Sequence, residues 1–377
     1  MKYKISTLKP EEFDEMMLFL EKSYRHYRNY FPKRYPHVWR KDTIDYDNKL
    51  VLKIDSKIVS HVGIFKLMLD IDGIKLKVGG IGAVATLQEH RGKGYMSILM
   101  REAIKKMKRE GYPFSILWGD RQRYGHFGYE TAGRGLTVHI SSRSLEQEYN
   151  PQKVEFQRFY GEEQLLRKII NSHEKEPLKV LRSRRDYELI FNKDDLMTYV
   201  SEHGSYISFY HGNPSHFVEV GGDPHDLVSL VYSVLSEVGR DKRVGSISIL
   251  LPFYPYEEVQ LLMKVGYHWK IEAVGLGKIL NLFTLLEAYE PLISRRSKDI
   301  DLELTLEIKE TGEKVGISIH RGEVEIIKDR EFSKKVSLNE REMVRFLFVD
   351  PEIVAGSLPL IKEVFPLPFY IWPLDHI

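Results

Sequence analysis

The sequence contains no cysteine, which excludes disulfide bonds and thiolate metal sites. It also has no apolar run near the roughly 20 residues that a membrane-spanning helix requires. Basic and acidic residues nearly balance, at 56 Lys and Arg against 54 Asp and Glu, so the overall charge does not favour a nucleic-acid partner. The first residues, MKYKISTLKPEEFDEMM, lack an apolar signal-peptide core. We therefore expect a cytoplasmic protein with neither a membrane nor a nucleic-acid partner.

Length and composition indicate a folded protein of several domains. The chain has 377 residues, of which 42% are hydrophobic and 29% charged, as in globular rather than disordered proteins. At about 100–200 residues per domain, this length predicts two to three domains. The pattern changes near residues 150 and 286, which divides the chain into regions 1–150, 151–285 and 286–377. Because strand and helix patterns alternate, we predict the α/β (α+β) fold class.

The first region predicts a hairpin followed by a strand, a loop, a helix and another strand. Asp72-Gly73 is a strong hairpin signal between two β-rich stretches. Apolar residues recur with helical spacing after residue 95, while lysines lie on the opposite side. The predicted elements are strands at 2–8, 50–54, 58–69, 74–86 and 113–118, and helices at 10–27 and 96–109.

The loop at residues 90–94, HRGKG, lies between a predicted strand and a predicted helix. Such a loop presents backbone N–H groups and the positive end of the helix dipole, which suit a phosphate. Gly92 and Gly94 let the backbone approach a pyrophosphate closely, because neither carries a Cβ. The loop thus predicts a phosphate-bearing ligand, and Tyr124 downstream could supply a proton to the group that this ligand delivers.

A competing motif precedes this loop. Residues 80–85, GIGAVA, satisfy the dinucleotide fingerprint G-x-G-x-x-G/A as a string. That fingerprint must join a strand to a helix. Here it falls inside a β-rich stretch, so nicotinamide binding is the disfavoured alternative.

Three further patterns have plain structural interpretations. His211 and His216 share a loop, but no third ligand lies nearby in the sequence, so we predict no metal site. Asp70 and Asp72 begin like a calcium loop, yet lysines follow at ligand positions, which favours a hairpin turn. The basic and aromatic run at 26–37 is interpreted as a helix end or a wall of an acceptor pocket, with nucleic-acid binding as the alternative.

The last two regions show no second phosphate loop. A helical pattern begins at Asp223, but no basic glycine-rich loop precedes it. The third region predicts strands at 301–308, 314–320 and 323–328 and a helix at 339–348. The tail at 365–373 holds three prolines, which prevent a helix, yet it is too apolar to remain in water. We predict that it docks on the folded body.

The loop and the turn YGHFGY at 124–129 resemble motifs of the GNAT acetyltransferase superfamily. Residues 90–94 resemble its R-x-x-G-x-G/A coenzyme loop, although Met96 stands at the final Gly or Ala position. This departure, together with the 124–129 turn, is similar to the Eis (enhanced intracellular survival) branch. The resemblance implies two GNAT-like mixed-sheet units, the second without a coenzyme loop, and a sterol-carrier-protein-like α+β domain, at 1–150, 151–285 and 286–377.

The resemblance also implies a co-substrate, acetyl-CoA, and the residues that hold it. These are Val84, Ala85 and Thr86 for the pantetheine, Arg91, Gly92, Lys93, Gly94, Tyr95, Met96 and Ser97 for the pyrophosphate, and Gly119 and Asp120 beside the thioester. Tyr124 takes the general-acid position. A phenol, with a pKa of about 10, is protonated at neutral pH and can donate to a departing thiolate.

The implied base is the terminal carboxylate of Ile377. Asp375 and His376 are alternatives, because the family's best-known members end in an aromatic residue and this chain does not. The implied function is acetyl transfer to the primary amine of a small molecule or peptide, aminoglycoside-like or lysine-like, by a homo-oligomer, a hexamer in Eis proteins. The alternative is a non-catalytic protein that binds coenzyme A or a lipid.

Overall fold

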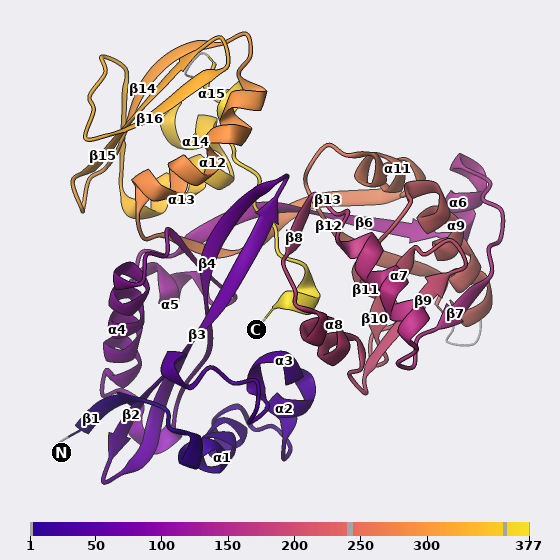
Figure 1. Cartoon of the computed structure of the whole chain (residues 1–377), viewed down its shortest axis with the longest axis horizontal. Helices are drawn as coiled ribbons and strands as arrows, with labels where there is room; N and C mark the ends of the chain where they lie inside the picture. Colours follow the sequence, from indigo (N-terminus) through magenta and orange to yellow (C-terminus); the bar gives the residue numbers. More distant parts are fainter. Residues whose placement is uncertain (1–2, 240–243, 357–359, 377) are drawn as a thin grey trace. The chain divides into compact units, whose positions relative to one another are not determined.

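The computed structural model describes residues 3–239, 244–356 and 360–376. Its elements group into two compact units, each built from separate stretches of the chain. Unit 1 combines residues 1–133 with 275–367, and unit 2 combines residues 134–274 with 368–376. Helices and strands mix in both units, which confirms the predicted fold class (Figure 1). The division into three domains stays a prediction.

The main sheet of unit 1 has the strand order β1-β2-β3-β4-β5-β13. Neighbours are antiparallel except β4 and β5, which are parallel and therefore need a helical crossover, α4. The predicted hairpin joins β3 to β4 through Asp72 and Gly73, both with positive φ. The strands are β1 (Tyr3–Thr7), β2 (Lys49–Ile54), β3 (Lys57–Ile71), β4 (Ile74–Thr86), β5 (Phe114–Leu117) and the end of β13 (His268–Ile279).

Helices cover both faces of this sheet. Alternate side chains of a strand point to opposite faces, so neighbouring residues of one strand pack against different helices. Leu50 and Leu52 pack in a cluster with α4, whereas Val51 packs in a cluster with α1 (Figure 1). The helices are α1 (Phe13–Tyr24), α2 (Tyr30–Arg34), α3 (Pro36–Trp39), α4 (Tyr95–Arg109) and α5 (Arg121–Gly125). The first ends at Tyr24 rather than at residue 27, since Arg25 is left-handed, with φ 58°.

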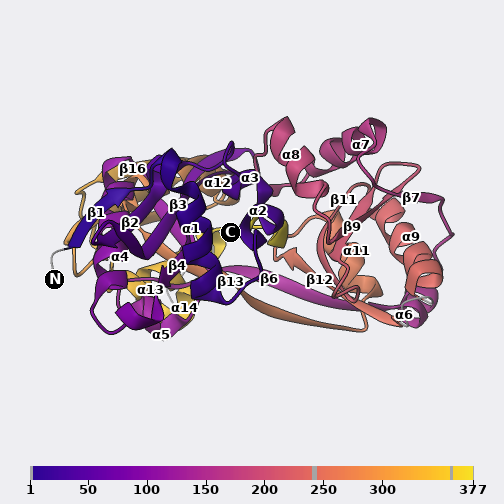
Figure 2. The same ribbon diagram turned by 90° about the horizontal axis from the view of Figure 1, so that it is seen from below.

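The strands of unit 2 follow the order β6-β12-β11-β10-β9-β7, and β8 lies outside this order. Here β11 and β12 are parallel, and α9 is the crossover between them. In Figure 2, α7 and α8 lie together along one side of this unit. The strands are β6 (Glu130–Ser141), β7 (Phe156–Arg158), β8 (Leu178–Val180), β9 (Leu196–Ser201), β10 (Tyr206–Tyr210), β11 (His216–Gly221) and β12 (Ser246–Pro252). The helices are α6 (Ser142–Glu148), α7 (Glu163–His173), α8 (Arg184–Phe191), α9 (Pro224–Val234) and α11 (Glu257–Val265).

The remainder of unit 1 is a four-stranded sheet with helices, in the order β16-β15-β14-β17. The three predicted meander strands and the predicted helix are present, and Gly312 and Gly322 have positive φ at the turns. The sequence did not predict β17, which pairs in parallel with β14. The elements are α12 (Leu282–Arg296), β14 (Asp301–Ile308), β15 (Glu313–His320), β16 (Glu323–Lys328), β17 (Lys335–Leu338), α13 (Glu340–Phe348), α14 (Pro351–Ala355) and α15 (Ile361–Val364).

The proline-rich tail is buried, as predicted from its composition. Within unit 2, the Tyr370 hydroxyl donates to Leu250 O at 2.7 Å and Trp372 Nε1 donates to Leu178 O at 3.2 Å. Both side chains are almost fully inaccessible to solvent. Among the described residues, no helix has the length and apolarity needed to span a membrane.

Candidate active site

A glycine-rich loop begins α4, the crossover helix of unit 1. The loop follows β4 and a short turn at Gln88–His90, and Gly94 is the N-cap of the helix. No side chain caps this helix start. Its first amide groups are therefore available to a ligand, at the positive end of the helix dipole.

Both loop glycines have a backbone conformation that favours glycine. Gly92 and Gly94 have φ values of 75° and 76°, and a Cβ at either position would meet nothing within 4 Å. Arg91 and Lys93 are exposed on the same loop, and each donates to a backbone carbonyl oxygen. The loop thus combines open space, cationic side chains and an uncapped helix start.

The rest of the predicted pyrophosphate site lies in the first turn of α4. Tyr95 is buried in the core, whereas Met96 and Ser97 are half-buried. The Tyr95 side chain therefore packs inward, and what it offers a ligand is its backbone amide.

The strand before this loop runs past the end of its neighbour. Ile81 and Leu117 are the last residues paired between β4 and β5, so the β5 side of β4 is unpaired beyond that point. An extended ligand arm could pair with this exposed edge as an added strand does. The predicted pantetheine residues on this stretch are Val84, Ala85 and Thr86.

A β-bulge begins the unpaired stretch. Gly63 lies opposite Gly82 and His61 lies opposite Ala85, so two residues of β4 face one of β3. The bulge places the backbone of Ala83 in the left-handed region, with a φ of 49°. His61 Nδ1 donates to Ala83 O at 2.7 Å, and burial lowers the pKa of His61 to about 3. A neutral imidazole therefore fixes the backbone beside the open edge.

Tyr124 lies on α5, just after β5. Its ring packs directly on Gly119, where a Cβ would stand 2.5 Å from the ring. Asp120 caps α5 by accepting from Arg123 N at 2.6 Å, so its carboxylate has a structural task. Burial raises the pKa of Tyr124. The phenol therefore keeps its proton throughout the neutral range, as a general acid requires.

A pocket of about 200 Å³ lies beside Tyr124. The hydroxyl of Tyr24 donates to Val84 O at 2.9 Å and ties the end of α1 to the open stretch of β4. Several members of the run at 26–37 line the pocket, which favours the pocket-wall interpretation of that run. The lining residues are Tyr24, His26, Tyr30, Phe31, Tyr35, Trp39, Ile81, Gly82, Ala83, Val84, Trp118 and Tyr124.

The candidate bases at the end of the chain have different positions. Ile377 lies outside the described residues. Asp375 is buried in unit 2, where its carboxylate accepts from Arg182 at 2.7 and 2.8 Å. His376 Nε2 donates to Ile371 O at 3.2 Å, and burial lowers its pKa to about 4. The two alternative bases thus have partners within unit 2.

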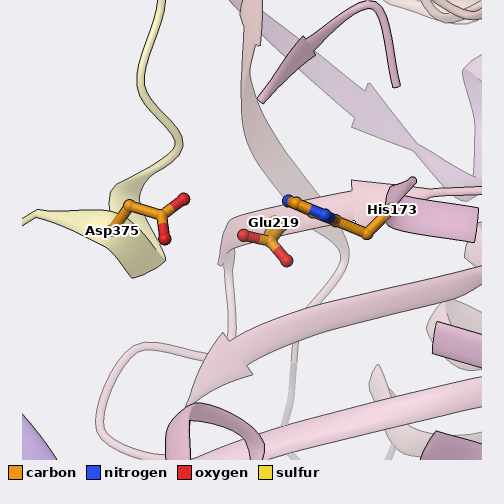
Figure 3. Close-up of side chains that lie close together, drawn as sticks. All are labelled: His173, Glu219 and Asp375. Atoms are coloured by element: carbon orange, nitrogen blue, oxygen red, sulfur yellow. The ribbon is translucent and has the colours of Figure 1, made fainter. Parts of the chain in front are cut away.

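One cluster in unit 2 has metal-ligating side chains. Figure 3 shows His173, Glu219 and Asp375, whose ligand atoms lie within 4.8 Å of one another. The guanidinium of Arg182 already binds both carboxylates, and His173 Nδ1 hydrogen-bonds the Tyr187 hydroxyl at 2.7 Å. The two carboxylates of this cluster thus already share an internal cation, and we assign it no metal.

Comparisons with known proteins show which proteins this chain is similar to. Residues 4–132 match the family model described as acetyltransferase (GNAT) domain. A comparison with curated protein sequences gives no match. The solved structure of a GCN5-related N-acetyltransferase from Kribbella flavida is similar, with a TM-score of 0.71 and 16% identity over 100% of this chain and 98% of that one. The chain shares the GNAT fold.

Two further structures extend the likeness. A probable N-acyltransferase from Enterococcus faecalis has a TM-score of 0.71 and 16% identity, over the full length of both chains. Eis1 from Mycobacterium abscessus has a TM-score of 0.67 and 11% identity, also over both full lengths. The predicted GNAT resemblance is therefore confirmed for residues 4–132, and the likeness to an Eis protein holds at the level of fold. The tandem units and the sterol-carrier-like domain stay predictions.

Several residues of this site carry no signal in the sequence. His61, Trp39 and Trp118 carry no motif, and the first two meet only because β3 lies against the N-terminal helices. Tyr24 lies within the predicted helix 10–27, but its bond to Val84 joins positions 60 residues apart. The aromatic richness of the 26–37 run was the one local signal.

Proposed function

We propose that this protein is an acetyl-CoA-dependent N-acetyltransferase that acts on a primary amine. The observation that carries the proposal is the arrangement in unit 1, where Tyr124 and the beginning of an unpaired strand edge line one pocket, and the same strand leads to an uncapped glycine-rich helix start. Each feature suits a different part of the reaction: the pyrophosphate, the pantetheine arm and the departing thiolate.

The coenzyme residues of the proposal follow this arrangement. The amides of residues 91–97 would hold the pyrophosphate, with Arg91 and Lys93 adding charge, and the stretch 84–86 would pair with the pantetheine. Gly119 would let the Tyr124 ring pack closely against the backbone beside the thioester. Asp120, which caps α5, would contribute through its backbone and by holding Tyr124 in place.

The proton transfers need an acid and a base. The amine attacks the thioester carbonyl and loses a proton, while the carbon–sulfur bond breaks and the thiolate gains one. Tyr124 would donate that proton. The Ile377 carboxylate remains our proposed base, and His26, which lines the pocket, is a second group able to accept the amine proton.

An assay of thiol release tests the proposal directly, because the chain has no thiol of its own. Thiol release from acetyl-CoA should appear only when an amine is present, and calorimetry should show acetyl-CoA binding without any amine. Binding without turnover on any amine would favour the non-catalytic alternative instead.

Two changes separate the candidate bases. A glycine–serine extension after Ile377 should abolish most turnover while coenzyme binding persists, if the terminal carboxylate is the base. His26→Gln should then retain its turnover and its pH profile. The reverse pattern would assign the role to His26.

Assembly and location stay proposals of the same kind. A hexamer is implied by the resemblance to Eis proteins, and light scattering of the purified protein tests it. A cytoplasmic location would supply acetyl-CoA, and cell fractionation tests it.

A further inference from the structure

The pocket beside Tyr124 is aromatic and carries no negative charge. Seven of its lining side chains are Tyr, Phe or Trp, one is His, and none of the described lining residues is Asp or Glu. The rings support one another, since Phe31 lies 5.4 Å from Trp39 and 5.6 Å from Tyr24, centroid to centroid. His26 stacks on Tyr30 at 3.7 Å. This wall offers flat apolar faces that suit an aromatic ring.

The ionisable group behind the wall is a lysine, and burial lowers its pKa to about 7. Lys49 is 1% exposed, and its Nζ lies 5.2 Å from the Trp39 ring centroid and 3.9 Å from that of Phe65. Asp45, which interacts with Lys49 through charge, is already bound by Asn48 and Lys66. The carboxylate nearest to Lys49 in this argument thus already has partners of its own and is not free to bind a ligand with several positive charges.

The segment that supplies the wall is strongly basic. Residues 22–41 contain no Asp or Glu and seven cationic residues, namely Lys22, Arg25, Arg28, Lys33, Arg34, Arg40 and Lys41. Lys22 pairs with Glu89 at 2.8 Å. Arg25, Arg28 and Lys33 are exposed and make no ion pair within the described part of the chain. The same short segment thus carries aromatic lining residues and an excess of positive charge.

We propose that the acceptor is a primary amine that carries both an aromatic ring and an anionic group, and that polycationic amines are poor acceptors. This inference rests on the proposed function and names its substrate class. The ring would stack on the aromatic wall, and the anionic group would meet the arginines of residues 22–41, where charge raises the rate of encounter and sets specificity. Polycations such as aminoglycosides would be repelled by the same segment.

A matched set of amines tests the inference. Phenylalanine and phenethylamine share a ring and differ in the carboxylate, and kanamycin supplies a polycation. We expect kcat/KM for phenylalanine to exceed that for phenethylamine at least 10-fold, with kanamycin lowest. Added salt should lower kcat/KM for phenylalanine but not for phenethylamine, because salt screens exposed charges.

Charge reversal identifies the source of the preference. The double variant Arg25→Glu/Arg28→Glu should remove most of the preference for phenylalanine over phenethylamine. Its control, Lys105→Glu/Lys108→Glu on the exposed side of α4, should leave the preference unchanged. An unchanged preference in the first variant would contradict the role of the basic segment.

The possible outcomes distinguish a wrong substrate class from a wrong proposed function. If acetyl-CoA binds and kanamycin is acetylated faster than phenylalanine in a Tyr124-dependent way, the inference falls and the proposed function stands. If acetyl-CoA does not bind and no amine turns over, both fall.

Discussion

The two units each place a helix between parallel strands, yet these helices begin in opposite ways. In unit 1, α4 begins after Gly94 without any side-chain cap. In unit 2, α9 begins after Asp223, whose carboxylate accepts from the amides of His225 and Asp226, both at 3.0 Å. The same crossover thus leaves donors open in one unit and satisfies them with an anion in the other.

The glycines next to the two helix starts also differ in the space that surrounds them. A Cβ at Gly94 would stand in open space, whereas a Cβ at Gly222 would lie 2.4 Å from Ser205 Oγ. An anion that approached α9 would meet a carboxylate and packed atoms. The comparison shows that a strand–helix–strand crossover does not by itself create a phosphate site. The loop chemistry does.

The two units also differ in whether their charged side chains are buried and paired or exposed. Unit 2 buries Arg182 with Glu219 and Asp375 and pairs them internally, while unit 1 exposes Arg91 and Lys93 on its glycine-rich loop. We therefore expect changes at the unit 1 site to alter binding and turnover, and changes in the unit 2 cluster to alter stability.

The largest effect is expected from Tyr124→Phe. Loss of the donated proton should lower kcat at least 100-fold, while the dissociation constant of acetyl-CoA stays within about 2-fold. Steady-state kinetics and calorimetry check both. Tyr129→Phe is the matched control, because the hydroxyl of that residue bonds Ser115 in the core. It should cost about 1 kcal/mol of stability and little turnover. Equal losses of kcat in the two variants would contradict the role of Tyr124.

Asp375→Asn tests whether the buried ion-pair cluster of unit 2 serves stability rather than catalysis. Because Arg182 keeps Glu219 as a partner, the weakening of its hydrogen bonds to residue 375 should lower the free energy of unfolding by about 2 kcal/mol, without changing the pH profile of kcat/KM. Denaturant titration and kinetics measure the two quantities. Asp301→Asn, at an exposed pair with His320, should cost under about 1 kcal/mol. A shifted pH profile in the first variant would instead identify Asp375 as the catalytic base.

Gly94→Asp would give α4 the kind of charge that begins α9. Placing a carboxylate at a helix start that binds an anion should cost about 2 kcal/mol, or roughly a 30-fold weaker acetyl-CoA affinity. Gly94→Asn has a similar size and backbone strain but no charge, and it should lose much less. Equal losses in the two variants would mean that strain, rather than charge, governs the loop.

The smallest effect concerns a buried carboxyl pair of unit 2. Burial raises the pKa of Glu258 to about 7 and that of the adjacent Glu176 as well. A raised carboxyl pKa favours the folded state below pH 4.5, and this contribution is lost as the pH rises through 7. Glu258→Gln should therefore gain a few degrees in Tm relative to the wild type between pH 5 and pH 8. Glu257→Gln, the exposed neighbour, should show no such trend.

Local patterns predicted much of the fold and the coenzyme loop. Asp72-Gly73 dictates a hairpin through backbone conformation alone, and residues 90–94 dictate an open helix start for the same reason. Both effects act within a few residues, so a single sequence contains them. For the basic aromatic run, the pocket-wall interpretation is the one that the structure favours, although its partners on β4 and just after β5 were not evident from the sequence.

Long-range contacts account for what the sequence could not predict. The bond from His61 to Ala83 depends on a bulge in the register of β3 and β4. The pairing of Arg182 with Asp375 spans 193 positions, and no local pattern marks Asp375 as the partner of an arginine rather than as a base. Such contacts follow from packing between elements, which composition and periodicity do not specify.

The most direct test of the central claim is the stoichiometry of acetyl-CoA binding by calorimetry. If only the helix start of unit 1 is open to a pyrophosphate, the wild type should bind one acetyl-CoA per chain, and Gly94→Asp should weaken that single event about 30-fold. Two binding events per chain, or one event unaffected by Gly94→Asp, would contradict the account.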